Sequence, residues 1–241
     1  MRQSLNLLAG GALTLLLAGP SLAQGPTRHP TVAILDFTNS ALVDHQTYEP
    51  FSRGIGDILT TELSGSSAIT LVERDRLVAL LEEQDLLTAK RVDPATAARV
   101  GKLLGAQYVL VGGFVIDRRE RLRLDARAVN VETSEVAYVE TASGAAEDLL
   151  DVVAKLAEQM VRRMELPPLR SPEAKAPPRS EQKGKLQALL FYSTALVEEE
   201  RQRPERARAM YQRFLSETSA DFAVEQRQRA EERLRVLSGT L

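Results

Sequence analysis

Apolar residues along this chain follow two spacings, one typical of strands and one typical of helices. Residues 31–37 (TVAILDF) and 108–116 are nearly continuous apolar runs, as expected of strands covered on both faces. Residues 121–127 alternate strictly between apolar and charged side chains, with a leucine at 122 and at 124. This alternation predicts a strand with one buried and one solvated face.

Helical spacing predicts four helices, at residues 51–63, 73–85, 94–105 and 145–163. The third is the best marked, because Asp93 can cap its free amides and Pro94 suits its first turn. Gly105 ends it, since glycine readily takes a positive φ. With a short strand at 68–72 and a meander ending near Thr141, the predicted order is β-α-β-α-α-β-β-β-α. This order predicts an α+β domain at residues 31–165, in which helices cover a mixed sheet.

Proline marks the end of this domain. Residues 166–184 are rich in proline and poor in apolar side chains, which favours a stiff and extended linker. Residues 185–241 return to helical spacing and predict a segment of three amphipathic helices. Pro204 and residues 218–221 break that segment into its helices.

The helical segment resembles one tetratricopeptide repeat. Phe191, Ala195, Ala207 and Tyr211 have the spacing of that repeat's aromatic and small residues, whereas Glu198 stands where a larger apolar group is typical. A helical hairpin that only resembles the repeat is an equally open alternative. In either case a helix pair more often binds a partner than catalyses, so we predict a helical contact surface that includes Phe191 and Tyr211.

The N-terminal residues carry a targeting pattern. Arg2 precedes an apolar stretch, residues 5–18, that is too short to span a bilayer comfortably. Ser21 and Ala23 are small residues at the positions that a signal peptidase recognises. We therefore predict a signal peptide at residues 1–23, cleaved after Ala23, and a short leader at 24–30. An uncleaved membrane anchor is the alternative.

Composition narrows the function classes. The net charge is −2 at pH 7, so no global basic field attracts nucleic acid or anionic lipid. Cysteine is absent, which excludes disulfides, thiolate nucleophiles, cysteine metal sites and a lipid-modified cysteine. Tryptophan is absent as well, and aromatic residues make up only 5%, which disfavours a carbohydrate-binding platform.

Candidate residues for catalysis or ligand binding are few. His29 and His45 are both in predicted loops, and two histidines without cysteine cannot form a structural zinc site unless carboxylates help. The sequence Gly54-Ile55-Gly56 lacks the third glycine of a dinucleotide fingerprint, and Gly101-Lys102 lies within a predicted helix. Asp36 ends the first strand without an identifiable catalytic partner, so we interpret it as a hydrogen-bond acceptor. We predict a non-enzymatic protein with no catalytic residue, metal or cofactor.

Runs of charge have simple interpretations. Glu82-Glu83 and Glu198-Glu199-Glu200 are predicted to be solvated helix faces. The arginines of residues 118–127 are not interleaved with aromatic residues, as a nucleic-acid surface would be. We interpret them as a solvated strand face, with a contact surface for an acidic partner as the alternative.

Five segments, in this order, resemble the curli production assembly/transport component family, CsgG. They are residues 31–37 (TVAILDF), 51–63 (FSRGIGDILTTEL), 71–84 (LVERDRLVALLEEQ), 92–113 (VDPATAARVGKLLGAQYVLVGG) and 122–136 (LRLDARAVNVETSEV). The resemblance covers most of residues 31–164. It implies a domain that forms rings or stacks in the periplasm of the cell envelope.

Two parts of the family pattern are missing here. The lipidated cysteine is absent, and the connections after residues 116 and 139 are too short for membrane hairpins, whose strands need about 9–11 residues each. The resemblance also places the loop at residues 39–50 where the family has its channel-constricting loop. If this protein forms a ring, Tyr48 and Phe51 would line its inner rim. A plain surface loop, with Phe51 packed under the first helix, is the alternative.

Two function classes therefore compete. The first is a non-enzymatic periplasmic adaptor or assembly component in curli-type secretion, which acts through association with other envelope proteins or with itself. The second is a subunit of an outer-membrane secretion channel. An exported hydrolase has only Asp36 in its favour.

Overall fold

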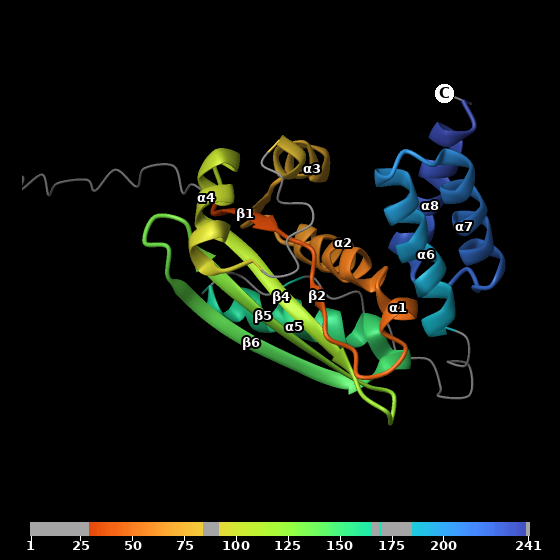
Figure 1. The fold of residues 1–241 in the computed structure, drawn as a ribbon, viewed down its shortest axis with the longest axis horizontal. Helices are drawn as coiled ribbons and strands as arrows, with labels where there is room; N and C mark the ends of the chain where they lie inside the picture. The colour runs from red at the N-terminus through yellow and green to blue at the C-terminus, as the bar shows by residue number, and fades with distance from the viewer. Residues whose placement is uncertain (1–28, 84–91, 165–168, 170–184, 240–241) are drawn as a thin grey trace, which may run out of the picture.

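The structure is a computed structural model that describes residues 29–83, 92–164, 169 and 185–239 (Figure 1). The predicted signal peptide lies outside the described residues, as does nearly all of the predicted linker. The predicted α+β fold with a mixed sheet is confirmed. None of the described helices is both long and apolar enough to cross a membrane.

A six-stranded mixed sheet forms the centre of the molecule. Its strands are β1 (Thr31–Ile34), β2 (Thr38–Asn39), β3 (Thr70–Leu71), β4 (Tyr108–Ile116), β5 (Arg121–Asn130) and β6 (Val136–Ala145). Their order is β3-β1-β4-β5-β6, and β2 pairs beside β1 on the outer half of β4. Strands β1, β3 and β4 are parallel, whereas β4, β5 and β6 form an antiparallel meander.

The helices follow the predicted order, with small additions. They are α1 (His45–Tyr48), α2 (Phe51–Ser64), α3 (Arg74–Glu83), α4 (Pro94–Leu104), the 3-10 turn η1 (Ala146–Asp148), α5 (Leu149–Arg163), α6 (Lys185–Glu200), α7 (Pro204–Ser216) and α8 (Val224–Leu237). The sequence missed the two-residue β2 and the single-turn α1, because neither is long enough to show a periodicity. The caps of α4 are confirmed: Asp93 accepts from Thr96 N at 2.9 Å, and Gly105 has φ 69°.

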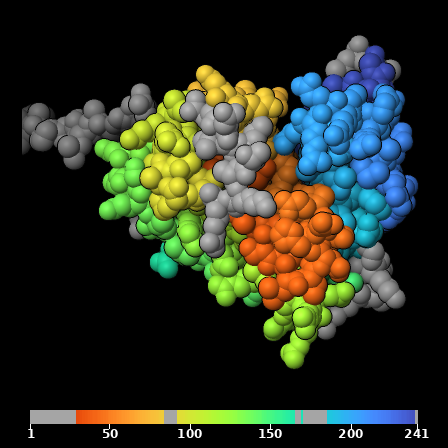
Figure 2. All heavy atoms as spheres, viewed as in Figure 1, coloured from red at the N-terminus to blue at the C-terminus, as the bar shows by residue number. Residues whose placement is uncertain are grey.

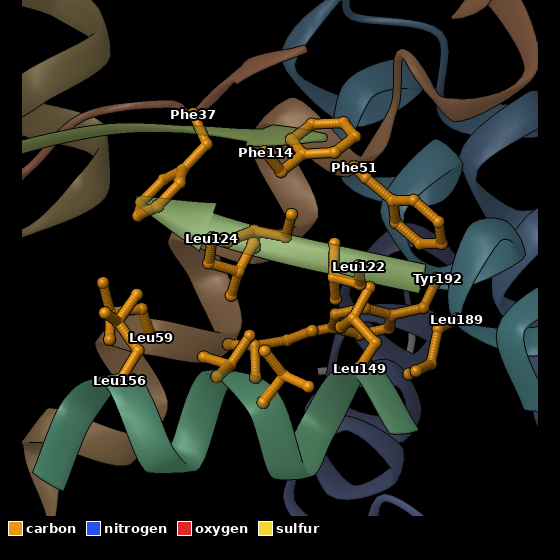
Figure 3. Close-up of a cluster of buried hydrophobic side chains, with 14 of the residues drawn as sticks. Phe37, Phe51, Leu59, Phe114, Leu122, Leu124, Leu149, Leu156, Leu189 and Tyr192 are labelled. Carbon is orange, nitrogen blue, oxygen red and sulfur yellow. The ribbon is translucent and has the colours of Figure 1, made fainter. Parts of the chain in front are cut away.

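Helices cover both faces of the sheet. On one face α3 and α4 enclose a small apolar cluster with β1, β4 and β5. On the other face α2 and α5 build the main core, and α6–α8 extend that core beyond α2 (Figure 1). The main core joins β5 through Leu122 and Leu124, α5 through Leu149, and α6 through Leu189 and Tyr192 (Figure 3).

The alternation of β5 is confirmed residue by residue. Leu122, Leu124 and Ala126 are buried, whereas Arg121, Arg123 and Arg127 are exposed. Burial of the first set against α2 and α5 removes apolar surface from water at about 25 cal/mol per Å². The exposed set lies on a part of the sheet that α3 and α4 do not cover, so its solvated interpretation is correct.

Helix α6 approaches α2 closely because two small residues face each other. Gly54 of α2 lies against Ser193 of α6, which is fully buried. A Cβ added at Gly54 would lie only 2.7 Å from Ser193 Cβ and would collide with its hydroxyl oxygen. Gly54, the first glycine of the incomplete dinucleotide fingerprint, is therefore needed for helix packing.

We predict that Gly54→Ala destabilises the protein by roughly 1–3 kcal/mol, because α2 and α6 must move apart to accept the methyl group. Chemical denaturation measures the change. The double variant with Ser193→Gly should recover part of the loss, since the facing side chain is then removed. Gly65→Ala is the matched control: this glycine has φ −64°, and its nearest neighbour is Glu62 O at 3.4 Å. Equal losses at the two glycines would contradict the packing argument.

Candidate functional site: a charged cleft beside the C-terminal helices

A cleft opens where the α+β domain meets the C-terminal helices. It consists of two adjoining hollows of about 490 and 230 Å³, and both are lined by Arg53, Asp57, Glu73, Arg74 and Arg229. Helices α2, α3, α6, α7 and α8 all contribute to its walls. In the space-filling view it lies between α3 and the blue C-terminal helices (Figure 2).

At the floor of this cleft, two arginines and two carboxylates connect α2, α3, α6 and the loop that follows β1. Arg53 of α2 donates from Nε to Glu200 Oε1 of α6 at 2.6 Å. Arg74 of α3 donates to both oxygens of the same carboxylate, at 2.8 and 3.2 Å. Arg74 also donates to both oxygens of Asp36, at 2.9 and 3.2 Å. Asp36 therefore accepts hydrogen bonds from a side chain of α3, in line with its interpretation as a hydrogen-bond acceptor.

Asp57 is the second centre of the network. Its side chain is only 5% exposed and accepts from Tyr192 Oη at 2.7 Å and from Arg229 Nη1 at 2.6 Å. Arg53 lies one turn earlier on α2, with its Nη1 3.5 Å from Asp57 Oδ1. One buried carboxylate thus links α2 to α6 and α8.

The acidic end of α6 is not a solvated face. Glu198 is buried and lies within 4 Å of the guanidinium groups of Arg201, Arg203 and Arg206. Glu199 accepts from Tyr211 Oη at 2.8 Å and pairs with an arginine of α8, Arg233. The predicted solvated interpretation of residues 198–200 is wrong. Arginines nearby in the sequence surround Glu198, whereas arginines distant in the sequence pair with Glu199 and Glu200, which a local pattern cannot show.

The network changes the pKa of its members. Burial opposes the charge on Arg53, but Asp57 and Glu200 outweigh it and raise the pKa of Arg53 above its ordinary value. Burial also acts to raise the pKa of Glu200, yet the hydrogen bonds from Arg74 and the charge of Arg53 hold it below its ordinary value. Burial raises the pKa of Tyr192, and the charge of Asp57 adds to the effect. These groups keep their charge states around neutral pH.

The residues predicted to line contact surfaces lie mostly inside the chain. Phe51 is fully buried and stacks on the partly exposed Tyr48, with ring centroids 5.9 Å apart. Phe191 is 9% exposed, and its ring lies 4.2 Å from the guanidinium carbon of Arg213. Tyr211 is fully buried against Tyr192. Of the four, Tyr48 offers the most surface to a partner.

The other candidates lie apart from the cleft. His45 is in α1 beside Glu49, and His29 precedes β1. Gly101 faces Val109 and Val131 inside α4, where a Cβ would lie 2.7 Å from a methyl carbon of Val109, so its role is packing. The described residues hold no group of three or more His, Asp or Glu side chains arranged to bind a metal ion.

The sequence carries one signal for this site. Arg53 and Asp57 are spaced four residues apart on the apolar helix α2, where charged side chains have no place unless they are paired. Their burial implies partners elsewhere in the chain. The partners themselves, Glu200 and Arg229, stand in charge-rich helices and have no distinguishing local pattern.

Chemically, this arrangement suits attachment better than proton transfer. A general acid or base acts best with a pKa near the working pH and access to its substrate. Here Asp36, Asp57 and Glu200 each accept hydrogen bonds from arginine. Against the opposing effect of burial, the hydrogen bonds from Arg74 and the charge of Arg53 hold the pKa of Glu200 below its ordinary value. Such pairs fix the positions of helices.

Residues 16–116 match the family model described as curli production assembly/transport component CsgG. The match confirms the resemblance over β1–β4 and the helices between them. The matched segment ends at Ile116, whereas the resemblance predicted from the sequence extends to about residue 164. No curated protein matches the chain.

Several solved structures are similar at low identity. The LpoB C-terminal domain from Salmonella enterica is 17% identical with a TM-score of 0.40, covering 51% of this chain and 87% of that one. The PelC dodecamer from Paraburkholderia phytofirmans is 14% identical with a TM-score of 0.36, covering 59% and 94%. Lipoprotein GNA1162 from Neisseria meningitidis is 12% identical with a TM-score of 0.38, covering 48% and 80%.

Replacing the central carboxylate should be costly. We predict that Asp57→Ala lowers the free energy of unfolding by about 3 kcal/mol, because Arg53, Tyr192 and Arg229 then lose their shared acceptor. Denaturation in guanidinium measures the loss. Glu205→Ala is the matched control, since this glutamate is 78% exposed and pairs with Arg208 at 3.3 Å; its loss should cost less than about 1 kcal/mol. A loss at Asp57 as small as that of the control would contradict a structural role.

Glu62 makes stability depend on pH. Burial raises the pKa of this α2 residue to about 7, and the charges of Glu225, Glu158 and Asp151 add to the effect. The folded state then binds a proton more tightly than the unfolded state, whose pKa is about 4.5. Stability is therefore fullest below about pH 4.5 for this group and falls as the pH rises toward 7.

We predict that Glu62→Gln removes this loss and leaves the variant more stable than the wild type at pH 8. The difference should be on the order of 1 kcal/mol, because partial exposure of Glu62 screens the charges. Thermal or chemical unfolding between pH 5 and 8 provides the comparison. Parallel pH profiles of the two proteins would show that Glu62 titrates normally.

Proposed function

We propose that this protein is a non-enzymatic, exported CsgG-like component of a cell-envelope assembly or secretion system. It acts through protein–protein association, as an adaptor or assembly factor of the curli type. The observation that carries this proposal is the match of residues 16–116 to the family of an assembly/transport component. The partners are other envelope proteins, and no cofactor takes part.

The cleft supports a role in association. Paired charges close the floor of the cleft, whereas the rim at α3 carries carboxylates that are not paired within the described part of the chain. Glu73, Asp75 and Glu82 line the cleft and are exposed, and none of them has an ion pair among the described residues. These carboxylates lie beside the helical segment, so a partner with basic side chains could contact α3 and the C-terminal helices together. This surface replaces the buried Phe191 and Tyr211 in the proposal.

The compartment follows from the N-terminal sequence. Export through the signal peptide of residues 1–23 places the mature protein in the periplasm, where it would lie peripherally at the outer membrane. The alternative function is a subunit of a curli-type secretion channel, favoured by the same family match. In that case self-association into a ring would bring the loop of Tyr48 toward the axis.

Fractionation distinguishes the two functions. We expect osmotic shock to release the protein with the periplasmic contents, because the adaptor needs no membrane span. Recovery only after detergent extraction would favour the channel subunit. Recovery in the cytoplasm would contradict both the adaptor function and the channel function.

The proposed contact surface can be tested in the same cells. A photo-cross-linking amino acid in place of Glu82, at the rim of the cleft, should capture one or more envelope proteins. Glu132, exposed in the turn between β5 and β6, is the matched control position and should capture none. Equal capture at the two positions would show that the cleft rim is not selective.

A further inference from the structure

Strand β6 forms an open edge of the sheet over its full length of ten residues. Within the part of the chain that the structure describes, it pairs only with β5. The outward N–H and C=O groups of residues 136–145 therefore have no backbone partner among the described residues. The opposite edge is different, because β3 is only two residues long. Figure 1 shows β6 along the outer border of the sheet, with α5 behind it.

This edge has few of the features that usually prevent strands from pairing with other chains. Edge strands are commonly protected by lysine, proline, a β-bulge or a covering element. The register shift of β6 against β5 lies near its start, at Ala137, and residues 138–145 pair regularly. Strand β6 (VAYVETASGA) contains no lysine or proline, and Glu140 is its only charged residue. Glu140 is turned toward α5, where it accepts from Arg163 Nε at 2.6 Å. The other face exposes apolar surface, because Val139 is 55% exposed.

We infer that β6 pairs with β6 of a second copy of this chain, antiparallel and centred on Val139. A two-fold axis requires each residue to face its symmetry mate on the same side of the sheet. Centring on Glu140 would place two carboxylates directly opposite, which is unfavourable. Centring on Thr141 would leave Val139 opposite a serine, Ser143. The register at Val139 joins the more exposed valine of each copy and pairs more of the strand than centring on Val136, the other exposed valine, would.

The same register gives complementary neighbours on the other face. Tyr138 of one copy comes opposite Glu140 of the second, and the reverse pair is made by symmetry. Tyr138 is half-buried, with its ring centroid 6.2 Å from that of Tyr108 on β4. In the paired copies its side chain lies on the same face as the carboxylate that Arg163 orients. Ala137 comes opposite Thr141, two small side chains that let the strands approach. The pairing continues the sheet across both copies and satisfies the open edge.

This inference gives the association proposed above a surface and a partner, and it rests on that proposal only for its biological use. The lack of cysteine in the chain allows a direct test of the register. Purified Val139→Cys should form a disulfide-linked dimer on mild oxidation, because only the central residue faces its own copy within the 4.4–6.8 Å between Cα atoms that a disulfide spans. Ala137→Cys and Thr141→Cys should each remain monomeric alone, since their own copies lie about 13 Å away. A mixture of these two variants should cross-link.

Sedimentation tests the interface without a cross-link. The wild-type chain should sediment with about double its monomer mass, and Val139→Lys should lose the dimer because two ammonium groups then face each other. Val224→Lys is the matched control, because Val224 is 47% exposed on α8, away from the sheet, and this variant should retain the dimer. A wild-type monomer at all concentrations, or a dimer unchanged by Val139→Lys, would overturn the inference.

Two further outcomes are informative. A monomeric chain whose Val139→Lys variant loses a captured envelope protein would assign the β6 edge to that protein and overturn self-pairing. Cross-linking from Glu82 without a dimer would leave the proposed function standing while this inference fails. A dimer that is recovered from the cytoplasm would support the pairing of β6 and contradict the proposed function.

Discussion

Charge pairs between nearly buried and partly exposed side chains hold the C-terminal helices against the α+β domain. Arg53 and Asp57 project from α2 into this boundary, and Glu200 and Arg229 meet them from α6 and α8. A buried ion without a partner costs several kcal/mol, so any other seating of these helices is penalised. Apolar contacts alone would tolerate small shifts of α6–α8 relative to α2, whereas the hydrogen-bonded charge pairs tolerate few such shifts. The network therefore determines where α6–α8 lie, and with them the walls of the cleft.

Close packing and charge act on the same helix. Gly54 lets α6 approach α2, and that approach brings Tyr192 within hydrogen-bonding distance of Asp57. The two features depend on each other, because a wider spacing would break the hydrogen bond and admit water to the charges. As a result, the family-like domain and the helical segment present their surfaces in a fixed relative orientation. An association component benefits from such rigidity, since less freedom is lost when it binds.

The sequence predicted the elements of this fold well where a local physical rule applies. Alternation identified β5, and the capping residues Asp93 and Gly105 bounded α4 to within a residue. It failed at the site, because the site depends on contacts between residues far apart in the chain. Glu200 has the surroundings of an ordinary solvated glutamate, and only the folded chain brings Arg53 and Arg74 to it. The prediction that Phe191 and Tyr211 form a contact surface failed for a related reason. Their spacing, which suggested a binding surface, instead packs them into the protein's own core.

The distance between the two halves of the network in the chain has a consequence for how this protein folds. Arg53 and Glu200 are separated by 147 positions, so Arg53 has its neighbour Asp57 but not its Glu200 partner until most of the chain is available. Contacts of such long range form late and slow the folding of a domain. The N-terminal part would then remain loosely structured while the rest is being synthesised. The predicted signal peptide would give late completion a use, because a chain that has not yet closed its interior can still be threaded across a membrane.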